Sequence, residues 1–572
     1  MASKDDAVSL IPLGGTGAIG KNMILLEQDD QILVIDAGLM FPDEDLLGVD
    51  IVIPDMTYLF ENSDKVLGVI LTHGHEDHIG AAPFLLERLR APVWGTRLTL
   101  ALLQNKLDEY GLADVEPMTA VEADECVSIG PFEVEFVVVN HSVPDGVGLG
   151  IRTKQGLIVH SGDFKFDQTP TQGRVADIHR LAAFGAEGVL ALISDCTNVD
   201  KPGYTPSERT VGLTFEQLFG SAKGRIVIAT FASNVSRIQQ VFDVARHYGR
   251  KVAVVGRSMV RVTETAESLG YLRIEPGARV DVRDIGDLAP DETVILTTGS
   301  QGEPLSALSL MATGHHKHLR VEPGDTVIIS ASTIPGNEAL ILRTINNLYR
   351  QGAHVVHGPE MGVHVSGHGN QEDIKLLLSL VPPKYVIPYH GEHRHLVQYH
   401  ALATEIGIPE SSVFLLDIGD RLEFRGGKAR LAGRVPAGSV NVDGLGVGDV
   451  GEVVLRDRQI LSEAGVIVVA LAVDMRTGRL AAGPEVHTRG FVYVHEAGDL
   501  LADLQQLARE VAGKHRRVPP DIKRLSEDLR SAIRKRVFSV TERRPMVLPA
   551  VLGVDYPEEK EGASSEDVSR PC

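Results

Sequence analysis

Six consecutive positions, from His73 to His78 in the stretch HGHEDH, carry three histidines and two carboxylates. His73 and His75 are two apart and can point to the same side of a loop, whereas Asp77 and His78 can reach a second point nearby. Imidazole and carboxylate are ligands that zinc prefers. A solvated polar loop is the alternative, but no packing requirement produces the pattern H-x-H-x-D-H. The pattern therefore predicts a site for two metal ions.

Strand-like runs precede each of the side chains that could complete this site. The apolar run KVLGVILT predicts a short buried strand before the cluster, which then lies in a loop at a sheet edge. His141 follows the β-rich run VEFVVVN, and Asp163 follows GLIVH. Taken singly, His141 is equally typical of a hydrogen-bonded structural histidine, and Asp163 of a turn or a cap. Together they supply further ligands, which a two-metal site needs.

A glycine-rich stretch near the start, GTGAIG, matches the dinucleotide-binding fingerprint G-x-G-x-x-G, with Asp36 where an acidic ribose ligand could stand. That fingerprint requires a helix after the glycines. Here NMILLEQDDQILVIDAG gives two β-rich runs around a polar turn, which predicts a hairpin. We interpret the glycines as a turn between antiparallel strands. Asp36 then ends the second strand, where we expect it to support the metal ligands.

Composition limits the class of protein. The chain has 572 residues, with 77 acidic and 56 basic side chains and a net charge of -21, which disfavours general attraction to membranes or nucleic acid. Its three cysteines are too widely spaced for a disulfide framework or a thiolate metal site. The N-terminus MASKDDAVSL lacks the features of a signal peptide, and the run AGVIVVALAV is far shorter than a membrane span. We expect a cytoplasmic protein of two to four domains that does not bind membranes.

The ordered series of Asp36, H-x-H-x-D-H, a later histidine and a later aspartate resembles the motifs of the metallo-β-lactamase superfamily, a four-layer αββα fold. The resemblance implies one metal held by His73, His75 and His141, a second held by Asp77 and His78, and Asp163 as the bridge between them. It also implies a last histidine ligand, for which the candidate is His390 in KYVIPYHGEH. Because His390 comes so late in the chain, a large segment must be inserted before it.

The inserted segment has its own pattern. Short apolar strands alternate with polar or helical stretches in RIVIATFAS, KVAVVG, ETVILTTGSQGE, DTVIISAS and AHVVHG, which predicts a mostly parallel sheet. Before them, TPSERTVGLTFEQLF predicts a helix with a capping box of Thr205 and Glu208 and with Pro206 as its first residue. The insertion is similar to the β-CASP group, the branch of the superfamily that processes nucleic acids. ISDCTN, HVSGHG and IPYHGE match its added motifs at Asp195, His368 and His390.

The phrases TGSQGEP, SASTIPGNE and PYHGEHRHL resemble the ribonuclease J family most closely, and the resemblance runs from about residue 8 to 556. It implies an α/β fold class, a metallo-β-lactamase αββα sandwich interrupted by an inserted β-CASP α/β domain, plus a small C-terminal α+β domain. We expect the sandwich at 1–205 and 361–440, the β-CASP domain at 206–360, a linker with some extended structure at 441–458, a C-terminal oligomerisation domain at 459–556 and a disordered tail at 557–572. In that family the C-terminal domain supports assembly, which implies a homodimer or homotetramer.

The chemistry that two zinc ions per subunit would supply is hydrolysis of a phosphodiester, because such a pair activates water and binds phosphate oxygens. The leaving 3′ oxygen then needs a proton, and an imidazole is a natural donor near neutral pH. We predict His368 as that acid and Asp195 as the residue that orients it. A structural carboxylate at a strand end is the alternative for Asp195. The predicted catalytic residues are His368, Asp195, Asp77 and Asp163.

Two loops could hold RNA despite the negative charge of the chain. FASNVSR and HVSGHG gather small hydroxyl, amide and backbone donors, a pattern typical of an anion-binding turn. Ordinary turn chemistry is the alternative for any single residue. The predicted RNA- and phosphate-binding residues are Ala232, Ser233, Asn234, Ser236, His364, Val365, Ser366, Gly367 and His368. Arg237, Arg257 and Arg261 could line the path, although surface arginines are common.

The family resemblance implies that this pocket holds the 5′-monophosphate end of single-stranded RNA. The expected activity is 5′-to-3′ exonuclease action, with endonuclease cleavage as a second activity, in rRNA processing and mRNA decay and alongside other RNA-decay enzymes. A DNA-directed β-CASP nuclease, a small-molecule thioester or lactam hydrolase, and a non-catalytic RNA-binding relative are the competing hypotheses. The last of these should have lost metal ligands, and this sequence retains them. The remaining histidine-rich stretch, TGHHKH, we interpret as solvated, and His393 and His395 we leave outside the ligand set.

Overall fold

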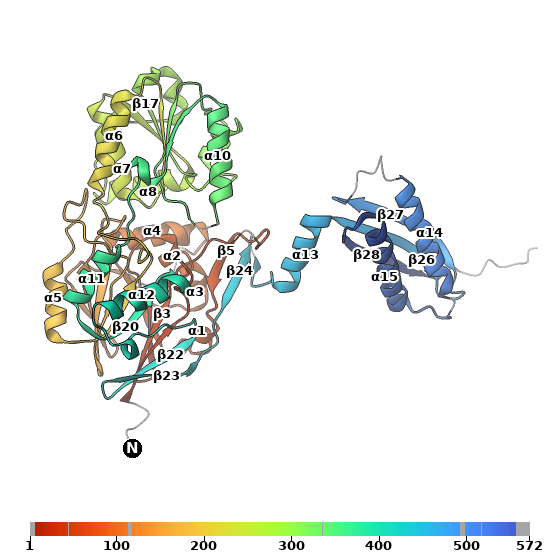
Figure 1. Ribbon diagram of the computed structural model, residues 1–572, viewed down its shortest axis with the longest axis horizontal. Helices are drawn as coiled ribbons and strands as arrows, with labels where there is room; N and C mark the ends of the chain where they lie inside the picture. Colours follow the sequence, from red (N-terminus) through yellow and green to blue (C-terminus); the bar gives the residue numbers. More distant parts are fainter. Residues whose placement is uncertain are drawn as a thin grey trace, which may run out of the picture. The chain divides into compact units, whose positions relative to one another are not determined.

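The computed structural model describes residues 6–43, 45–112, 117–334, 336–444, 446–491, 498–515 and 517–555. The chain forms two compact units, the first of residues 1–43 and 50–444 and the second of residues 44–49 and 445–572. The first unit contains a sandwich of two sheets and an inserted domain with a sheet of its own (Figure 1). In the part of the chain that the structure describes, no helix is long and apolar enough to cross a bilayer.

The sandwich is built from two mixed sheets whose facing sides share one apolar core. The first has the order β23-β22-β1-β3-β4-β6-β7-β8, with β1 at Val8–Pro12, β3 at Ile24–Gln28, β4 at Gln31–Ile35, β6 at Val66–Ile70, β7 at Val93–Gly95, β8 at Met118–Ala120, β22 at Asp420–Arg425 and β23 at Lys428–Arg434. The second has the order β20-β13-β12-β11-β10-β9, with β9 at Cys126–Ile129, β10 at Phe132–Val138, β11 at Val147–Thr153, β12 at Gly156–His160, β13 at Val189–Asp195 and β20 at Pro383–Tyr389. Leu10 and Leu26 of one sheet and Phe136 of the other lie in this core.

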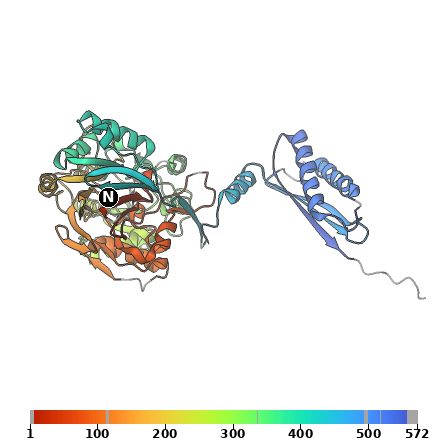
Figure 2. The same cartoon turned by 90° about the horizontal axis from the view of Figure 1, so that it is seen from below.

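Helices cover the outer face of each sheet and complete the αββα layers that the sequence predicted. Helices α3 (Ala82–Arg88) and α4 (Arg97–Glu109) pack on the first sheet, and α5 (Ile178–Glu187), α11 (Gln371–Leu380) and α12 (His393–Glu405) pack on the second. Figure 2 shows the strands between these two helical layers. The chain thus returns to the sandwich after the insertion, although the domain boundaries that we expect stay predictions.

The hairpin predicted after the glycine-rich stretch is present. β3 and β4 are antiparallel, with Ile24 opposite Ile35. Asp36 follows directly, with a left-handed φ of 61°. The glycine-rich stretch connects β1 and β3, which are antiparallel, and the described residues after it form β3 rather than a helix, so the nucleotide-binding fingerprint is excluded as we expected. Within the stretch, Thr16–Gly17 forms a two-residue strand, β2, which pairs with β21 (Gly391–Glu392).

The inserted domain is a parallel sheet with helices on both faces. Its order is β16-β15-β17-β14-β18-β19, with β14 at Ile226–Ala229, β15 at Lys251–Val255, β16 at Arg279–Val280, β17 at Thr293–Thr297, β18 at Thr326–Ile329 and β19 at His354–His357. Ile226 and Ile228 face α6 (Arg209–Ser221), α7 (Val235–His247) and α8 (Arg257–Ser268). Val227 and Ala229 face α9 (Ala307–Ala312) and α10 (Glu338–Arg350). The predicted parallel sheet is confirmed.

The capping box predicted at the start of this domain is wrong. Helix α6 begins at Arg209, and its N-cap residue Glu208 makes no capping hydrogen bond with its side chain. The Thr205 hydroxyl instead donates to the carbonyl oxygen of His368 at 2.8 Å, and the Glu208 carboxylate accepts from Arg237 at 2.8 Å. Both side chains make tertiary contacts, and these outweigh the local capping pattern.

The second unit holds a three-stranded sheet in the order β27-β26-β28, with β26 at Val466–Asp474, β27 at Leu480–Arg489 and β28 at Met546–Val554. Helices α14 (Gly498–Lys514) and α15 (Ile522–Thr541) pack on it, as the sequence predicted. A helix, α13, occupies Glu452–Ala464, where we expected a linker with extended structure up to residue 458. The predicted disordered tail lies outside the described residues.

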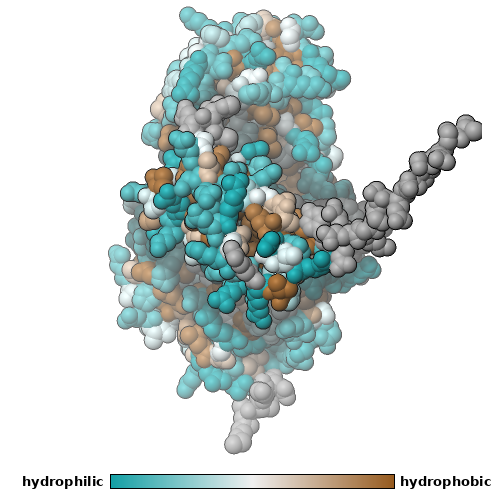
Figure 3. Space-filling view, turned by 90° about the vertical axis from the view of Figure 1, so that its right-hand side faces the viewer, coloured by the Kyte–Doolittle hydropathy of each residue, from teal (hydrophilic) through white to brown (hydrophobic). Residues whose placement is uncertain are grey.

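The molecular face in Figure 3 is mostly hydrophilic, with scattered apolar patches, in keeping with the charge of the chain.

Candidate metal centre and nuclease site

The loop after β6 carries the first four donor groups. His73 and His75 precede the short helix α2 (Glu76–Ile79), which contains Asp77 and His78. Asp36, at the end of β4, fixes this loop. Its Oδ1 accepts from the backbone N–H of Thr72 at 2.8 Å, and its Oδ2 lies 2.8 Å from Nδ1 of His78. Asp36 thereby orients the ring of His78. Its role in supporting a metal ligand stays a prediction.

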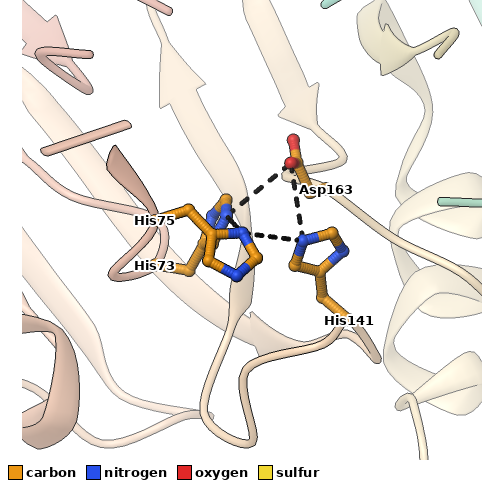
Figure 4. A group of neighbouring side chains, drawn as sticks. All are labelled: His73, His75, His141 and Asp163. Carbon is orange, nitrogen blue, oxygen red and sulfur yellow. Dashed lines mark hydrogen bonds and ion pairs between the residues drawn. The ribbon is translucent and has the colours of Figure 1, made fainter. Parts of the chain in front are cut away.

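Three histidines and one aspartate form the first group of donors (Figure 4). Nδ1 of His75 lies 3.0 Å from Nε2 of His73 and 3.1 Å from Nε2 of His141. Oδ2 of Asp163 lies 3.6 Å and 3.7 Å from the same atoms of His73 and His141. The four side chains come from three strand ends and point toward one another, as a metal site requires.

A second group shares Asp163 with the first. It consists of Asp77, His78, Asp163 and His390, with all of its ligand atoms within 4.8 Å of one another. Oδ2 of Asp163 lies 3.2 Å from Nε2 of His78, and Nε2 of His390 lies 3.1 Å from Oδ2 of Asp77. Asp163 is therefore placed between two clusters of donors.

The chemistry of these donors fits a pair of cations. Oδ2 of Asp163 is buried, and among the residues that the structure describes it has no hydrogen-bond partner. Burial lowers the pKa of His73 and of His141, and it lowers the pKa of His75 to about 4. In the first group, neutral imidazoles around a buried carboxylate are the form in which such side chains bind a metal ion. In the second group burial is outweighed by Asp163 and Asp77, which raise the pKa of His78 and raise that of His390 to about 10, so this group favours a positive charge.

The carbonyl oxygen of Gly367 sets the orientation of His141. Nδ1 of His141 donates to this oxygen at 2.9 Å, which leaves Nε2 as the lone-pair nitrogen that faces the other ligands. The approach is possible only for glycine, because a Cβ at position 367 would lie 2.5 Å from Cε1 of His141. The HVSGHG motif thus orients His141, a predicted metal ligand, as well as contributing His368.

His368 and Asp195 lie beside both donor groups. Nδ1 of His368 is 2.8 Å from Oδ2 of Asp195, and the ring centre of His368 is 4.9 Å from that of His141 and 5.2 Å from that of His390. The backbone of His368 is fixed because its carbonyl oxygen accepts from Thr205. The pair is placed to act on a group held between the two donor clusters.

The two loops predicted to bind phosphate are held together by a buried arginine. Nη1 of Arg237, in the helix that follows FASN, donates to the carbonyl oxygen of Val363 at 3.1 Å, next to His364. Asn234 caps this helix by accepting from the N–H of Arg237, so part of its hydrogen-bonding capacity serves the fold. Ser366 accepts from Nδ2 of Asn198 at 2.8 Å. The binding roles of these loops stay predictions.

Sequence reasoning missed the buried charges behind these loops. Arg237 is fully buried and pairs with Glu208, so it does not line an RNA path. Burial lowers the pKa of His364 to about 3, with a further contribution from Arg237, Lys165 and Lys201. A signal was present for Lys165, which stands between two buried phenylalanines directly after Asp163 in GDFKFD.

Two of the histidines that we left outside the site, His316 and His395, have local partners. Nδ1 of His316, in TGHHKH, accepts from the backbone N–H of Leu319 at 3.1 Å. Nδ1 of His395 accepts from the backbone N–H of Glu392 at 3.2 Å, in a capping box at the start of α12. These contacts are structural.

Comparison with known proteins identifies the family. Four family models match successive parts of the chain: the metallo-beta-lactamase superfamily at 16–200, the ribonuclease J beta-CASP domain at 223–348, the Zn-dependent metallo-hydrolase RNA specificity domain at 352–411 and the ribonuclease J C-terminal domain at 453–554. Ribonuclease J2 of Bacillus subtilis strain 168 is 42% identical over 548 residues, which cover 96% of this chain and 99% of that protein. The chain belongs to the ribonuclease J family. It is accordingly a metal-dependent nuclease with the metallo-β-lactamase and β-CASP domains of that family.

Other ribonuclease J proteins are similarly close. Ribonuclease J 1 of Streptococcus pyogenes serotype M3 is 42% identical, over 96% of this chain and 99% of that protein. Ribonuclease J 2 of Staphylococcus aureus strain NCTC 8325 is 39% identical, over 96% and 98%. Among solved structures, a protein of unknown function from Enterococcus faecalis V583 superposes with a TM-score of 0.52 at 16% identity, covering 73% of this chain and 99% of that one. That last similarity concerns the fold alone.

Proposed function

We propose that this chain is a zinc-dependent 5′-to-3′ exoribonuclease that prefers RNA with a 5′-monophosphate end, with internal cleavage as a second activity. The observation that carries the proposal is the position of Asp163 between two groups of donors, with the His368–Asp195 pair beside both. The relatives named above are all ribonuclease J proteins, which supports RNA as the substrate.

In this proposal each group of donors holds one of two zinc ions per subunit. His73, His75 and His141 would hold the first ion, Asp77, His78 and His390 would hold the second, and Asp163 belongs to both groups of donors. When bound, the ions lower the pKa of water and neutralise charge on the phosphate.

The remaining chemistry belongs to side chains of the protein. His368 donates a proton to the leaving 3′ oxygen. Asp195 holds Nδ1 of the imidazole, which directs Nε2 toward the substrate and stabilises the charged form. The buried contacts of Asp195 support this role, because its Oδ1 accepts from the backbone N–H of Thr197 at 2.9 Å and its orientation is thereby fixed.

The loops at 232–236 and 364–368 would bind the 5′ phosphate. Support comes from three cations near His364, the buried Arg237 and Lys165 and the exposed Lys201, which contribute, with burial, to its lowered pKa. Glu208 and Asp167 pair with the two buried cations and offset part of their charge. A phosphate bound at this position holds the 5′ end of the RNA one nucleotide away from the metal centre. Each cleavage then removes a single nucleotide from that end. We further propose a cytoplasmic homodimer or homotetramer that acts in rRNA processing and mRNA decay together with other RNA-decay enzymes.

The test is a parallel digestion by the zinc-loaded protein. Four substrates of one sequence are compared: 5′-monophosphorylated RNA labelled at the 5′ end, the same RNA labelled at the 3′ end, 5′-triphosphorylated RNA and single-stranded DNA. We expect labelled mononucleotide as the first product of the 5′-labelled RNA, slower loss of the triphosphorylated RNA and intact DNA. Metal analysis gives the identity and number of ions per subunit.

The control is His368→Ala, which removes the proposed acid and leaves the ligands in place. Release of label first from the 3′ end would contradict the polarity, and equal rates on mono- and triphosphorylated RNA would contradict the end preference. Faster digestion of DNA would favour a DNA-directed nuclease of the β-CASP group.

A further inference from the structure

The loop between β10 and β11 carries His141 and is held at both of its ends. At the first end, the side chain of Asn140 accepts from the backbone N–H groups of Asp167 and Ala176 at 3.3 and 3.0 Å. At the second end, Val147 donates to the carbonyl oxygen of Thr72, at 3.1 Å. Between them, His141 projects into the metal centre. The position of this ligand therefore depends on what fixes the loop.

Asp145 fixes the middle of the loop through a buried carboxylate. Its Oδ2 accepts from the backbone N–H of Leu98, near the start of α4, at 3.0 Å. The same oxygen accepts from the hydroxyl of Tyr271 at 3.0 Å. Leu98 belongs to the sandwich, whereas Tyr271 follows α8 in the inserted domain. One carboxylate thus joins the ligand-bearing loop to two domains.

The carboxylate depends on these few donors. Oδ1 of Asp145 is buried, and no hydrogen-bond partner for it is present in the described part of the chain. A buried carboxylate is costly unless donors compensate for the water that it has lost. Removal of the tyrosine hydroxyl would leave Asp145 dependent on donors from the sandwich alone, and the loop would then lose its tie to the inserted domain.

Tyr271 lies among hydrogen bonds that join the inserted domain to the sandwich. Its carbonyl oxygen accepts from Nε2 of Gln172, in the sandwich, at 2.7 Å. Nearby, Nδ2 of Asn105 in α4 donates to the hydroxyl of Thr265 in α8 at 2.9 Å. Tyr271 therefore lies in a docked interface between the two domains, and its side chain extends from that interface to the metal-binding loop.

Packing carries a shift of Asp145 to the ligands. Gly146 follows it, and a Cβ at this position would lie 3.7 Å from Cβ of His73 and 3.8 Å from Cβ of His141. These are ordinary van der Waals distances, so the loop leaves room for little more than a methyl group beside two histidines of the first donor group. A small displacement of the loop changes the separation of these ligands.

We infer that Tyr271 is a positioning residue for the metal centre: through Asp145 it holds the His141 loop, so that the metal site is complete only when the inserted domain is docked. The inference rests on the proposed role of His141 as a ligand. It assigns to the inserted domain a second task besides contact with RNA. The domain also determines how firmly the sandwich holds its metal.

The experiment compares Tyr271→Phe with Tyr248→Phe in the full-length, zinc-loaded protein. Tyr248 is a matched control because its hydroxyl donates to the carbonyl oxygen of Glu216 at 2.9 Å, wholly within the inserted domain. Zinc retention is measured against a chelator of known affinity, and kcat and KM are measured on 5′-monophosphorylated RNA. We expect Tyr271→Phe to weaken zinc retention by about fivefold to tenfold, near the lower end of the range for residues that orient metal ligands. kcat should fall with little change in KM, while Tyr248→Phe matches the wild type.

Two variants of Asp145 extend the test. Asp145→Asn keeps an oxygen acceptor for Leu98 and Tyr271 and should retain zinc nearly as well as the wild type. Asp145→Ala should lose zinc more readily, and adding Tyr271→Phe to it should cause no further loss, because both changes break one contact. If Asp145→Ala does not fold, the comparison of Tyr271→Phe with Tyr248→Phe still tests the inference.

Wild-type zinc retention and kcat in Tyr271→Phe would overturn the inference. Equal losses in Tyr271→Phe and Tyr248→Phe would overturn it as well, because the effect would then be a general loss of stability. His141→Ala shows whether a negative result concerns the role of Tyr271 or the proposed role of His141 as a metal ligand. If His141→Ala retains both ions, the ligand assignment itself is wrong.

Discussion

Nδ1 of His368 lies 2.8 Å from Oδ2 of Asp195, within a shell of buried groups that also holds the shared carboxylate of Asp163. Oδ2 of Asp163 is 3.9 Å from the same nitrogen of His368. One imidazole thus lies between a carboxylate placed to orient it and a carboxylate placed among metal ligands. Mutations can therefore distinguish metal binding by Asp163 from proton transfer by the His368–Asp195 pair.

Asp163→Ala and His368→Ala should fail in different ways. The first removes the atom shared by both groups of donors, so we expect loss of bound metal together with activity. The second leaves all seven proposed ligands and should retain zinc and RNA binding, while cleavage slows by about 10²- to 10⁴-fold, the usual contribution of a general acid. Metal analysis, RNA binding and single-turnover cleavage measure these outcomes. Equal loss of zinc in both variants would show that the roles are not divided in this way.

Gly367→Ala should damage the metal centre without changing a ligand. The new methyl group would lie 2.5 Å from Cε1 of His141, so either the ring or the HVSGHG loop must move. We expect weaker zinc retention and about tenfold or greater loss of activity, as is typical when the support of a ligand is removed. Gly407→Ala is a control for the methyl group, because nothing within the described residues lies within 4 Å of a Cβ there, although its positive φ of 97° adds some strain. Wild-type zinc affinity in Gly367→Ala would contradict the proposed orientation of His141.

Arg237→Met should destabilise the first unit. Arg237 is fully buried, and Glu208, its partner, is nearly so. Removal of the arginine leaves a buried, uncompensated carboxylate, which costs about 3–5 kcal/mol. Urea denaturation should show this loss, and the variant should also bind 5′-monophosphorylated RNA less well, because the contact with Val363 beside His364 is lost.

Glu208→Gln combined with Arg237→Met provides the check on this reasoning. The double variant removes both charges, so it should regain part of the stability that Arg237→Met loses. Arg283→Met is a surface control, since Arg283 and Asp281 form an exposed pair that contributes little. A loss in Arg283→Met as large as that in Arg237→Met would contradict the argument from burial.

The sequence predicted the parts of this protein that local pattern determines. The apolar runs before His73, His141 and Asp163 identify strands by composition, and strand ends are where loops present functional side chains. Alternating strands and helices likewise predicted the parallel sheet of the inserted domain. The start of α6 was missed because Thr205 and Glu208 form a local capping pattern but are used in contacts with distant residues.

Long-range contacts between ordinary polar residues left no signal in the sequence. Asp145 and Tyr271 are 126 positions apart, and neither belongs to a recognisable motif. The same holds for Arg237, which looks like a surface arginine of an amphipathic helix until its burial is known. Metal ligands are different, because the chemistry of the ion restricts the residue types at each position.

Asp145→Asn should change the dependence of stability on pH. Burial raises the pKa of Asp145, although polar groups of Thr96, Leu98 and Tyr271 oppose this shift. A raised pKa in the folded state means that the fold disfavours the charged form. The resulting penalty is absent below the usual value near 4, grows as the pH rises through the raised pKa, and is constant above it. The melting temperature of Asp145→Asn relative to the wild type should therefore rise between about pH 4 and neutrality.

Asp167→Asn should show the opposite trend and serves as the control. Burial tends to raise the pKa of Asp167, but the Ser207 hydroxyl and the backbone N–H groups of Glu208 and Thr169 outweigh it and hold the pKa below its usual range. The charged form therefore stabilises the fold, and this contribution is lost as the pH falls through the lowered pKa. Relative to the wild type, Asp167→Asn should become less stable as the pH rises. Thermal denaturation of both variants from pH 3 to 8, at constant ionic strength, measures the two slopes. Slopes of the same sign would show that the environments of these two buried carboxylates do not differ as the contacts indicate.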